Sequence, residues 1–171
     1  LATDEYDTVG GFIVNQLDHE KADFDRSMEQ LKENYGSKVV QIQYPISVGP
    51  QFNAVVDVLK MKMYRWKPEG GVPEVLDIPD TEINKAQDLH NALVEAAAEH
   101  DEALMEKFFD QGSLSEEEMR IGIRKGMLHR DMFPVFCVSA GKDMCVRRMM
   151  EFVGNVSPSV NVTEKPQTKD G

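Results

Sequence analysis

The chain has 171 residues, of which 41% are hydrophobic and 29% are charged, a composition typical of one globular domain with room for a small insertion. Its net charge of −11 argues against a general nucleic-acid-binding surface, because such a surface needs clustered basic residues to displace counterions from phosphates. The sequence shows no disulfide framework, no signal peptide and no run of ~18 apolar residues, so we expect a cytoplasmic protein that does not bind membranes.

The first predicted element is a short buried strand over residues 10–14, Gly-Gly-Phe-Ile-Val. This apolar run is too brief for a helix, and polar residues follow it at Asn15 and Asp18. A helix is predicted next over residues 23–35, with Gly36 placed to end it. Four apolar side chains recur in this segment at helical spacing: Phe24, Met28, Leu31 and Tyr35.

The middle of the chain carries short extended segments separated by turn residues. Residues 38–44 alternate enough to form a strand, and residues 49–50, Gly-Pro, mark a turn. Residues 52–59 are rich in β-branched side chains, residues 60–66 alternate, and residues 72–79 are short, acidic and expected to be extended. We interpret this region as a small β-sheet inserted into a larger domain.

The longest predicted element is a helix over residues 81–109, which a break near residues 100–101 divides in two. Ser115 and Glu118 form a capping box that starts another helix, which Gly126 is expected to end. An apolar stripe runs along the long helical segment: Ile83, Ala86, Leu89, Leu93, Val94, Ala97, Leu104, Met105 and Phe108.

A second buried strand is predicted over residues 133–138, followed by residues 139–142, Ser-Ala-Gly-Lys, and by a helix over residues 144–153. The tail over residues 158–171 is polar and is expected to be a linker. Ligands of open α/β sheets bind just beyond the carboxyl ends of strands, so both strand ends are candidate binding positions. A carboxylate at such an end can accept hydrogen bonds from N1–H and the amino group of guanine.

The two strand ends carry motifs that resemble those of a known family. Residues 15–18, Asn-Gln-Leu-Asp, resemble the Asn-Lys-x-Asp motif of translational GTPases, and residues 139–142 resemble their Ser-Ala-x-Lys motif. The resemblance covers nearly the whole chain, and the insertion favours elongation factor G over release-factor or ribosome-protection types. The segments between the motifs that are similar to bacterial elongation factor G are residues 19–24, 43–46, 52–57, 93–99, 104–109 and 123–126.

The resemblance implies an α/β fold: a partial P-loop GTPase-type three-layer domain with an inserted α+β subdomain. The GTPase domain is expected to comprise residues 1–36 and 131–157, the insertion residues 37–130, and the linker to a following domain residues 158–171. The sequence opens at Leu1 and contains neither the phosphate loop G-x-x-x-x-G-K-[ST] nor the switch regions, so we expect it to be part of a longer protein.

In the family, the aspartate matched by Asp18 selects guanine, and the asparagine matched by Asn15 ties its loop to neighbouring loops. The resemblance also implies that Ala140 offers a backbone N–H to guanine O6, that Ser139 shapes the turn and that Lys142 lies along the base or ribose. The alternative interpretation is that Asp18 caps the next helix and Lys142 is a solvated loop residue. The implied cofactor is GTP or GDP, held here by its guanine part, with Mg²⁺ expected only in the longer protein.

Two positions depart from the family. Gln16 replaces a lysine that packs on the guanine face, and losing such a contact costs about 0.5–2 kcal/mol, or up to ~30-fold in affinity. Cys145 replaces a glycine, and a positive φ there is strained for a residue with a side chain. The chain is therefore expected to belong either to an elongation factor G-like GTPase that promotes ribosomal translocation, or to a variant paralogue that is a ribosome-interaction module with weakened or lost nucleotide binding. No catalytic residue is expected in this chain, because phosphoryl transfer needs a phosphate cradle, Mg²⁺ and a positioned water.

Acidic side chains follow the outer face of the predicted helices, and the simplest interpretation is a solvated surface. The inserted subdomain of elongation factor G contacts the ribosomal stalk protein through acidic residues on a helix. Glu99 falls at the matching stretch, with Glu102 about one turn away, so the resemblance implies a salt-dependent contact with lysines of the stalk protein. No metal site is expected, because the four histidines are scattered in the sequence: His19, His90, His100 and His129.

Overall fold

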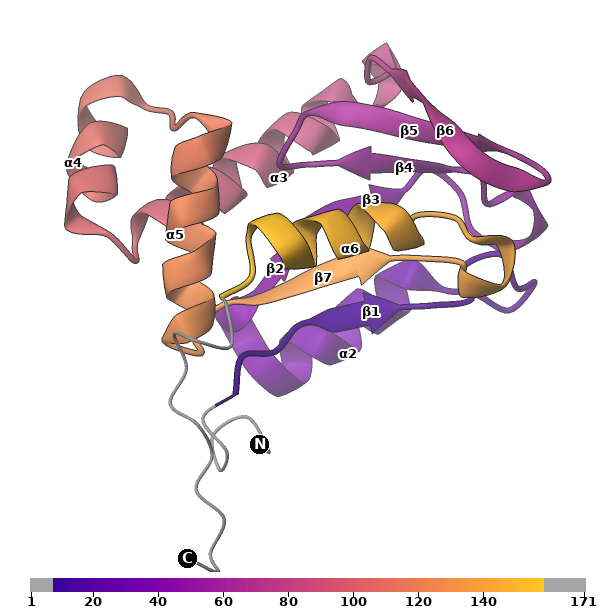
Figure 1. Ribbon diagram of the computed structural model, residues 1–171, viewed down its shortest axis with the longest axis horizontal. Coiled ribbons are helices and arrows are strands. Elements are labelled where there is room, and N and C mark those ends of the chain that lie inside the picture. The colour runs from indigo at the N-terminus through magenta and orange to yellow at the C-terminus, as the bar shows by residue number, and fades with distance from the viewer. Residues whose placement is uncertain (1–7, 159–171) are drawn as a thin grey trace, which may run out of the picture.

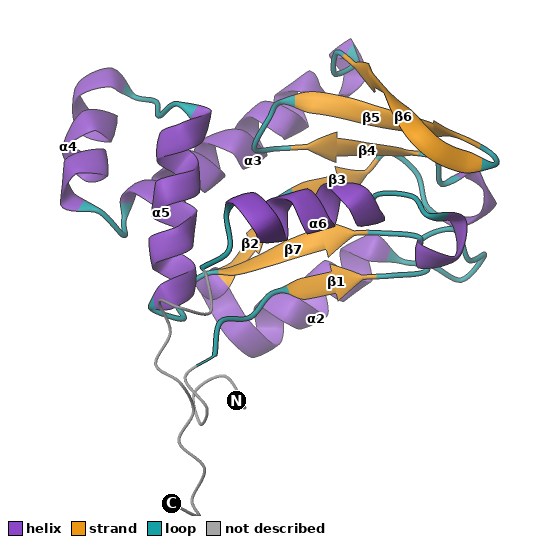
Figure 2. Cartoon of the chain, in the orientation of Figure 1, coloured by secondary structure: helices purple, strands orange, loops and turns teal. Residues whose placement is uncertain are grey.

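The computed structural model describes residues 8–158, which form a mixed α/β fold with two sheets (Figure 1, Figure 2). The α/β class expected from the sequence is thereby confirmed. One sheet is parallel and contains, in spatial order, β1 (Phe12–Val14), β7 (Phe133–Cys137) and β2 (Val39–Gln41). The other is antiparallel and contains, in spatial order, β3 (Gln43–Pro45), β4 (Ala54–Asp57), β5 (Lys62–Lys67) and β6 (Gly70–Leu76).

Helices cover both faces of the parallel sheet. Figure 1 shows α6 (Val146–Asn155) on one face and α2 (Phe24–Tyr35) on the other. None of the helices described in residues 8–158 is both long and apolar enough to cross a membrane. The helices that follow β6 are α3 (Asp80–Ala98), α4 (Glu102–Gln111) and α5 (Glu116–Leu128). Short 3₁₀ turns are η1 (Gly36–Lys38), η2 (Gly49–Gln51) and η3 (Ala140–Lys142).

β7 is the central strand of the parallel sheet, and every one of its residues is buried. A strand that is paired on both edges and covered on both faces needs apolar side chains throughout, which explains the unbroken apolar run in its sequence. The register pairs Val14 with Cys137, so β1 and β7 end at the same edge of the sheet. This shared edge positions the segments that follow the two strands.

The helix ends follow the signals in the sequence. Asp23 caps α2 by accepting a hydrogen bond from the Arg26 backbone N–H at 2.9 Å. The predicted break near residue 100 is confirmed, because α3 ends at Ala98 and Asp101 caps α4. The capping box at the start of α5 is also confirmed, and its residue Glu118 has a pKa lowered to about 2 by hydrogen bonds from Lys107 and Ser115.

Two predicted boundaries are wrong. The strand predicted over residues 38–44 is split at Ile42, where the chain leaves the parallel sheet and enters the antiparallel one. β2 therefore pairs with β7, although the predicted insertion over residues 37–130 included it. Gly126 does not end α5, which continues to Leu128, because this glycine serves helix packing: a Cβ there would lie 2.6 Å from the His100 ring.

A single apolar core extends between the two sheets and the helices. The last helix begins at Val146 rather than at residue 144, because Met144 forms a β-bridge with Ser139. Apart from Pro158, the tail predicted as a linker lies outside the described residues. The largest side chains that are almost completely buried include Tyr44, Phe52, Leu93, Met119, Ile123, Met132 and Met144.

Candidate functional site

Two loops follow β1 and β7 and lie side by side at one edge of the parallel sheet (Figure 1). We call residues 15–19 the Asp18 loop and residues 139–145 the Lys142 loop. The backbone joins them to the sheet and to each other, because Val138 donates to the Val14 carbonyl at 3.0 Å and Leu17 donates to the Val138 carbonyl at 3.4 Å. The parallel register thus unites two segments that are far apart in the sequence.

The Asp18 carboxylate is the charged centre of this edge. Its Oδ1 accepts a hydrogen bond from the Ser139 hydroxyl at 2.7 Å, and its Oδ2 lies 3.7 Å from the Lys142 Nζ. The hydrogen bond from Ser139 lowers the pKa of Asp18, with a smaller effect of the Lys142 charge, so the carboxylate is ionised at neutral pH. Its side chain is 25% exposed, and a carboxylate has more lone pairs than one hydroxyl uses, so it can still accept hydrogen bonds from a ligand.

The alternative role of Asp18 as a helix cap is wrong. The residue that caps α2 is Asp23, while Asp18 points its Oδ1 toward the other loop. Lys142 is likewise more than a solvated loop residue, because its ammonium group lies near the Asp18 carboxylate. Both charged side chains therefore belong to one local arrangement.

Asn15 ties the two loops together. Its Oδ1 accepts hydrogen bonds from the backbone N–H of Gln16 at 2.7 Å and of Ala140 at 3.0 Å. The N–H of Ala140, which the family resemblance assigned to a ligand carbonyl, is therefore bound to Asn15. A ligand acceptor reaches this N–H only if Asn15 moves or shares it.

The Lys142 loop is closed on itself by backbone hydrogen bonds. Ser139 and Met144 exchange two, at 3.1 and 3.0 Å, and Lys142 donates to the Ser139 carbonyl at 3.2 Å. The side chain of Ser139 is completely buried. These bonds close residues 139–144 into one hydrogen-bonded turn, which contains both Ala140 and Lys142.

The two positions that depart from the family motifs are backbone outliers. Gln16 has a φ of 60° and Cys145 has a φ of 66°, both in the left-handed region that favours glycine. The positive φ expected at position 145 is thus confirmed. Burial raises the pKa of the Cys145 thiol to about 12, which makes it a poor nucleophile.

A hollow opens beside the Asp18 loop, on the side of α2. Its lining includes Asn15, Gln16 and two cationic side chains, Lys21 just after the Asp18 loop and Arg26 in α2, but neither Asp18 nor Lys142. The two strand-end motifs gave no signal for this hollow, because Lys21 and Arg26 lie outside both of them. It extends the polar surface next to the candidate site.

Two turns from the antiparallel sheet also reach these loops. Gly49, in η2, donates its N–H to the Leu17 carbonyl at 2.7 Å. Gly70, at the turn between β5 and β6, packs closely on the Lys142 loop. A Cβ there would lie 2.4 Å from the Lys142 carbonyl oxygen. The sequence marked Gly49 as a turn residue, but a turn signal contains no information about what the turn packs against.

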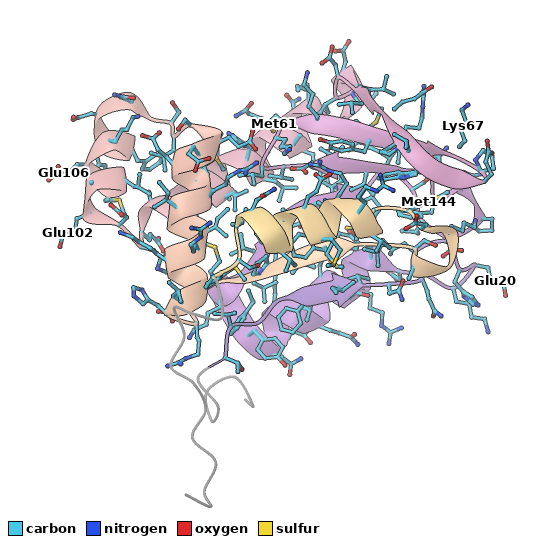
Figure 3. The ribbon with its side chains drawn as sticks, in the orientation of Figure 1. Glu20, Met61, Lys67, Glu102, Glu106 and Met144 are labelled. Atoms are coloured by element: carbon cyan, nitrogen blue, oxygen red, sulfur yellow. The ribbon has the colours of Figure 1, made fainter. Side chains whose placement is uncertain are left out.

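The two acidic residues assigned to a partner lie far from this edge. Glu99 follows the last residue of α3 and Glu102 starts α4, which Figure 1 shows at the opposite end of the molecule. Both are exposed, and neither pairs with another described residue. Figure 3 shows Glu102 and Glu106 directed away from the fold. Asp101, between the two assigned residues, is occupied as the cap of α4 and as the partner of Lys125.

Within residues 8–158, no group of three or more histidine, cysteine, aspartate or glutamate side chains is arranged to hold a metal ion. No family model matches the sequence. Among solved structures, the fold is similar to that of the protein ttk003000868 from Thermus thermophilus, with a TM-score of 0.79 and 22% sequence identity. The match covers 91% of this chain and 23% of that protein, so this chain corresponds to less than a quarter of its length. At this identity the likeness shows the fold alone.

Proposed function

We propose that this chain recognises guanine as part of an elongation factor G-like translational GTPase, which acts on the ribosome in the cytoplasm and promotes translocation. The observation that carries the proposal is the hydrogen bond from Ser139 to Asp18, because it joins the two motif loops and stabilises the ionised carboxylate. The resemblance of both loops to the family motifs supports the same function.

An ionised Asp18 suits guanine and disfavours adenine. Guanine presents two adjacent donors, N1–H and its amino group, whereas adenine presents a lone pair at N1. A carboxylate accepts both hydrogen bonds from guanine and repels the adenine lone pair. Sites that leave buried polar groups unpaired with the wrong ligand discriminate by up to ~10⁵, and the partial exposure of Asp18 favours a smaller ratio here.

The chemistry of GTP hydrolysis belongs to the remainder of the longer protein. The sequence contains no phosphate loop of the form G-x-x-x-x-G-K-[ST], so nothing in it matches the usual cradle for the β- and γ-phosphates or the usual hydroxyl ligand of Mg²⁺. We therefore expect the 171-residue chain to show no GTP turnover and to bind GDP only above micromolar concentrations. Measurable turnover by the purified chain contradicts this assignment.

The Asp18→Asn variant tests base recognition directly. An amide keeps one acceptor but replaces the second with a donor, which matches the O2 carbonyl of xanthine instead of the amino group of guanine. We expect GDP to bind about tenfold more weakly, and xanthosine diphosphate more tightly, than to the unaltered chain. The measurement is an NMR titration to millimolar nucleotide that follows the amide signals of Ala140 and Lys142.

Asp23→Asn is the matched control, because it makes the same chemical change at the cap of α2, where asparagine caps equally well. Its GDP affinity should equal that of the unaltered chain. If Asp18→Asn leaves the affinities for both nucleotides unchanged, Asp18 does not read the base and the proposal is wrong.

Two observations favour the second candidate function, a ribosome-interaction module with weakened nucleotide binding. The Ala140 N–H is already bonded to Asn15, and the residue at position 16 is a glutamine instead of a lysine. Restoring the face contact with Gln16→Lys should tighten GDP binding several-fold, up to ~30-fold, if the site is a working guanine pocket. Absence of GDP binding by both the unaltered chain and this variant favours the module.

We also propose that Glu99 and Glu102 contact lysines of the ribosomal stalk protein. The contact should weaken steeply with salt, because exposed charges are screened beyond about 8 Å at physiological ionic strength. Glu99→Lys with Glu102→Lys should slow association with the purified stalk protein about tenfold or more. Reversing Glu29 and Glu33, two exposed residues of α2, changes the net charge equally and is the control. Equal rates for the two double variants contradict the assignment.

A further inference from the structure

The antiparallel sheet contacts both loops of the candidate site through glycines with a positive φ. Gly49 and Gly70 both have a φ of 79° and both are buried. Gly49 lies in η2, between β3 and β4, and Gly70 is the first residue of β6, directly after the β5–β6 turn. Gly49 touches the Asp18 loop, and Gly70 touches the Lys142 loop. Figure 1 shows the turn between β5 and β6 at the same end of the molecule as the loop after β7.

We propose that Gly70 is a positioning residue for guanine recognition, which it serves by seating the β5–β6 turn against the Lys142 loop. The guanine part of this statement rests on the function proposed above. The antiparallel sheet thereby sets the geometry of the Lys142 loop. Binding of the base and the conformation of the β5–β6 turn are then linked.

The contact at Gly70 leaves no space for a side chain. A Cβ would lie 2.4 Å from the Lys142 carbonyl oxygen, closer than any stable contact, and the obstacle is backbone rather than the flexible end of a side chain. An added methyl group must therefore displace the loop or the turn. Because the loop is closed by the bonds between Ser139 and Met144, its displacement moves the Ser139 hydroxyl and the Ala140 N–H.

Gly49 holds the other loop through a hydrogen bond. Its N–H donates to the Leu17 carbonyl at 2.7 Å, immediately before Asp18. A Cβ at Gly49 would lie 3.8 Å from the nearest atom, an ordinary contact, so the link here is the hydrogen bond. β3, β4, β5 and β6 form one continuous sheet, which therefore supports both sides of the Asp18–Ser139 hydrogen bond.

A link of this kind is reciprocal, since any change that the sheet makes in base affinity must be matched by an equal effect of the base on the sheet. A change in the conformation of the β5–β6 turn would therefore change the affinity of the site for guanine. A partner bound near β5 and β6 would alter guanine affinity to the extent that it prefers one position of the turn.

The test compares Gly70→Ala with Gly71→Ala in the 171-residue chain. Gly71 has a φ of 91° and no atom within 4 Å of an added Cβ, so it carries the same backbone strain without the contact. Both variants should lose stability in urea unfolding through the shared backbone strain, and Gly70→Ala should lose more because only it adds the clash. We expect only Gly70→Ala to move the amide signals of Ala140 and Lys142, and to weaken GDP binding about tenfold by disturbing the Ser139–Asp18 bond.

A second measurement needs no variant. On titration of the unaltered chain with GDP, the amide signal of Gly70 should shift together with that of Lys142, while Phe109 on the remote α4 should not respond. A Gly70 signal that stays still while Lys142 shifts overturns the link, as do loop signals that respond equally to Gly70→Ala and Gly71→Ala. If GDP shifts no signal at all, the proposed guanine recognition fails, and the loop signals of the two variants still decide whether Gly70 seats the loop.

Discussion

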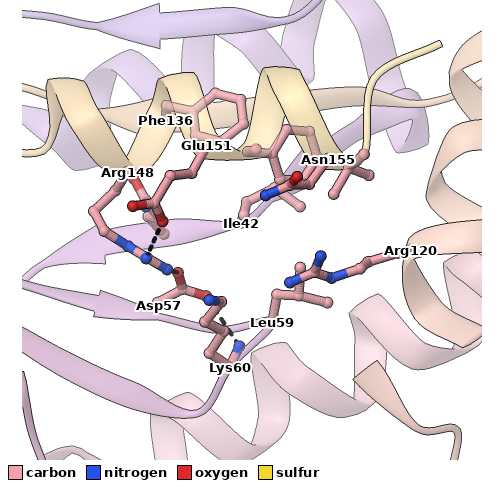
Figure 4. Close-up of a pocket in the computed structure, with 12 residues that line it drawn as sticks. Ile42, Asp57, Leu59, Lys60, Arg120, Phe136, Arg148, Glu151 and Asn155 are labelled. Atoms are coloured by element: carbon pink, nitrogen blue, oxygen red, sulfur yellow. Dashed lines mark hydrogen bonds and ion pairs between the residues drawn. The ribbon is translucent and has the colours of Figure 1, made fainter. Parts of the chain in front are cut away.

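At the scale of single residues, the buried ion pair of Asp57 and Arg148 fastens the antiparallel sheet to α6 (Figure 4). Asp57, on β4, is 5% exposed, and its Oδ2 lies 3.2 Å from Nη2 of Arg148. The guanidinium also lies over the Tyr64 ring, 4.2 Å from its centroid. Burial raises the pKa of Asp57, and the backbone N–H of Lys60 and the charge of Arg148 oppose that rise. The carboxylate thus depends on its partners to remain charged.

Removing the cation should be costly at neutral pH. Arg148→Met keeps most of the apolar stem but leaves Asp57 buried without its counter-ion, which costs about 3–5 kcal/mol of unfolding free energy. The folded state of this variant binds a proton at Asp57 more tightly than the unfolded state does. Its stability should therefore be greatest in acid and fall as pH rises, as urea unfolding at pH 5 and pH 7 will show.

The double variant Asp57→Asn with Arg148→Met is the control for this effect. It removes both charges, so it should regain part of the stability at pH 7 and lose the pH dependence that the single variant adds. A loss of less than about 1 kcal/mol in Arg148→Met, equal at both pH values, contradicts the role given to the pair.

At the scale of secondary-structure elements, the packing of α5 on α3 depends on a glycine. A Cβ at Gly122 would lie 2.1 Å from the Ala97 carbonyl oxygen, so the two helices approach within the space that a side chain would need. Gly126, one turn later, faces the His100 ring in the same way. These two positions explain why a helix contains glycines that lower its intrinsic propensity.

Gly122→Ala should therefore destabilise the fold. The added methyl group must push two helix backbones apart, and such overpacking costs about 1–3 kcal/mol. Gly154→Ala is the control, because it lies in α6 with open space around an added Cβ, and there alanine should stabilise by up to ~1 kcal/mol. Urea unfolding of both variants measures the difference. Equal effects of the two substitutions would show that the close approach of α5 and α3 is unimportant.

The elements themselves were largely predictable, because each depends on local signals. The apolar run of β7, the capping box at Ser115 and the break before α4 follow from residues close together in the sequence. Ile42 carried no such signal, because the bend there contains neither glycine nor proline and its β-branched side chain continues the strand pattern on both sides. Gly126 was misread for a related reason: a glycine that ends a helix and a glycine that packs against another helix look alike until the partner is known.

In the candidate site, too, the features that depend on local signals were predictable and those that depend on three-dimensional packing were not. The meeting of Asp18 with Ser139 was predictable from motifs at the ends of strands, since parallel neighbours end at one edge. The bond from Ala140 to Asn15 was not predictable, because a side chain selects among several acceptors by local geometry. The contact of Gly70 with Lys142 was also unpredictable, because it depends on how the two sheets sit against each other.

At the scale of the whole molecule, the parallel sheet has an open lateral edge along β1, distinct from the carboxyl ends of the strands where the candidate loops lie. Among the described residues β1 pairs only with β7, and a groove runs beside it toward α2, lined by Phe12, Ile13, Leu31 and Tyr35 among others. Ile13 on this edge is 54% exposed. Parallel sheets are normally covered on both faces, and unpaired edges with exposed apolar side chains attract further strands. Among the described residues, this edge is one surface suited to self-association.

We therefore expect the purified chain to associate reversibly as its concentration rises, and Ile13→Lys to suppress the association. A lysine at the edge places a charge where a second strand would pair, so the dissociation constant measured by sedimentation should rise about tenfold or more. Because Ile13 is half exposed, the unfolding free energy should change by no more than about 0.5 kcal/mol. Phe109→Lys introduces the same charge at a side chain that is 78% exposed on α4, away from any strand edge, and should leave association unchanged. Suppression by Phe109→Lys alone would place the contact on the helical end of the molecule instead.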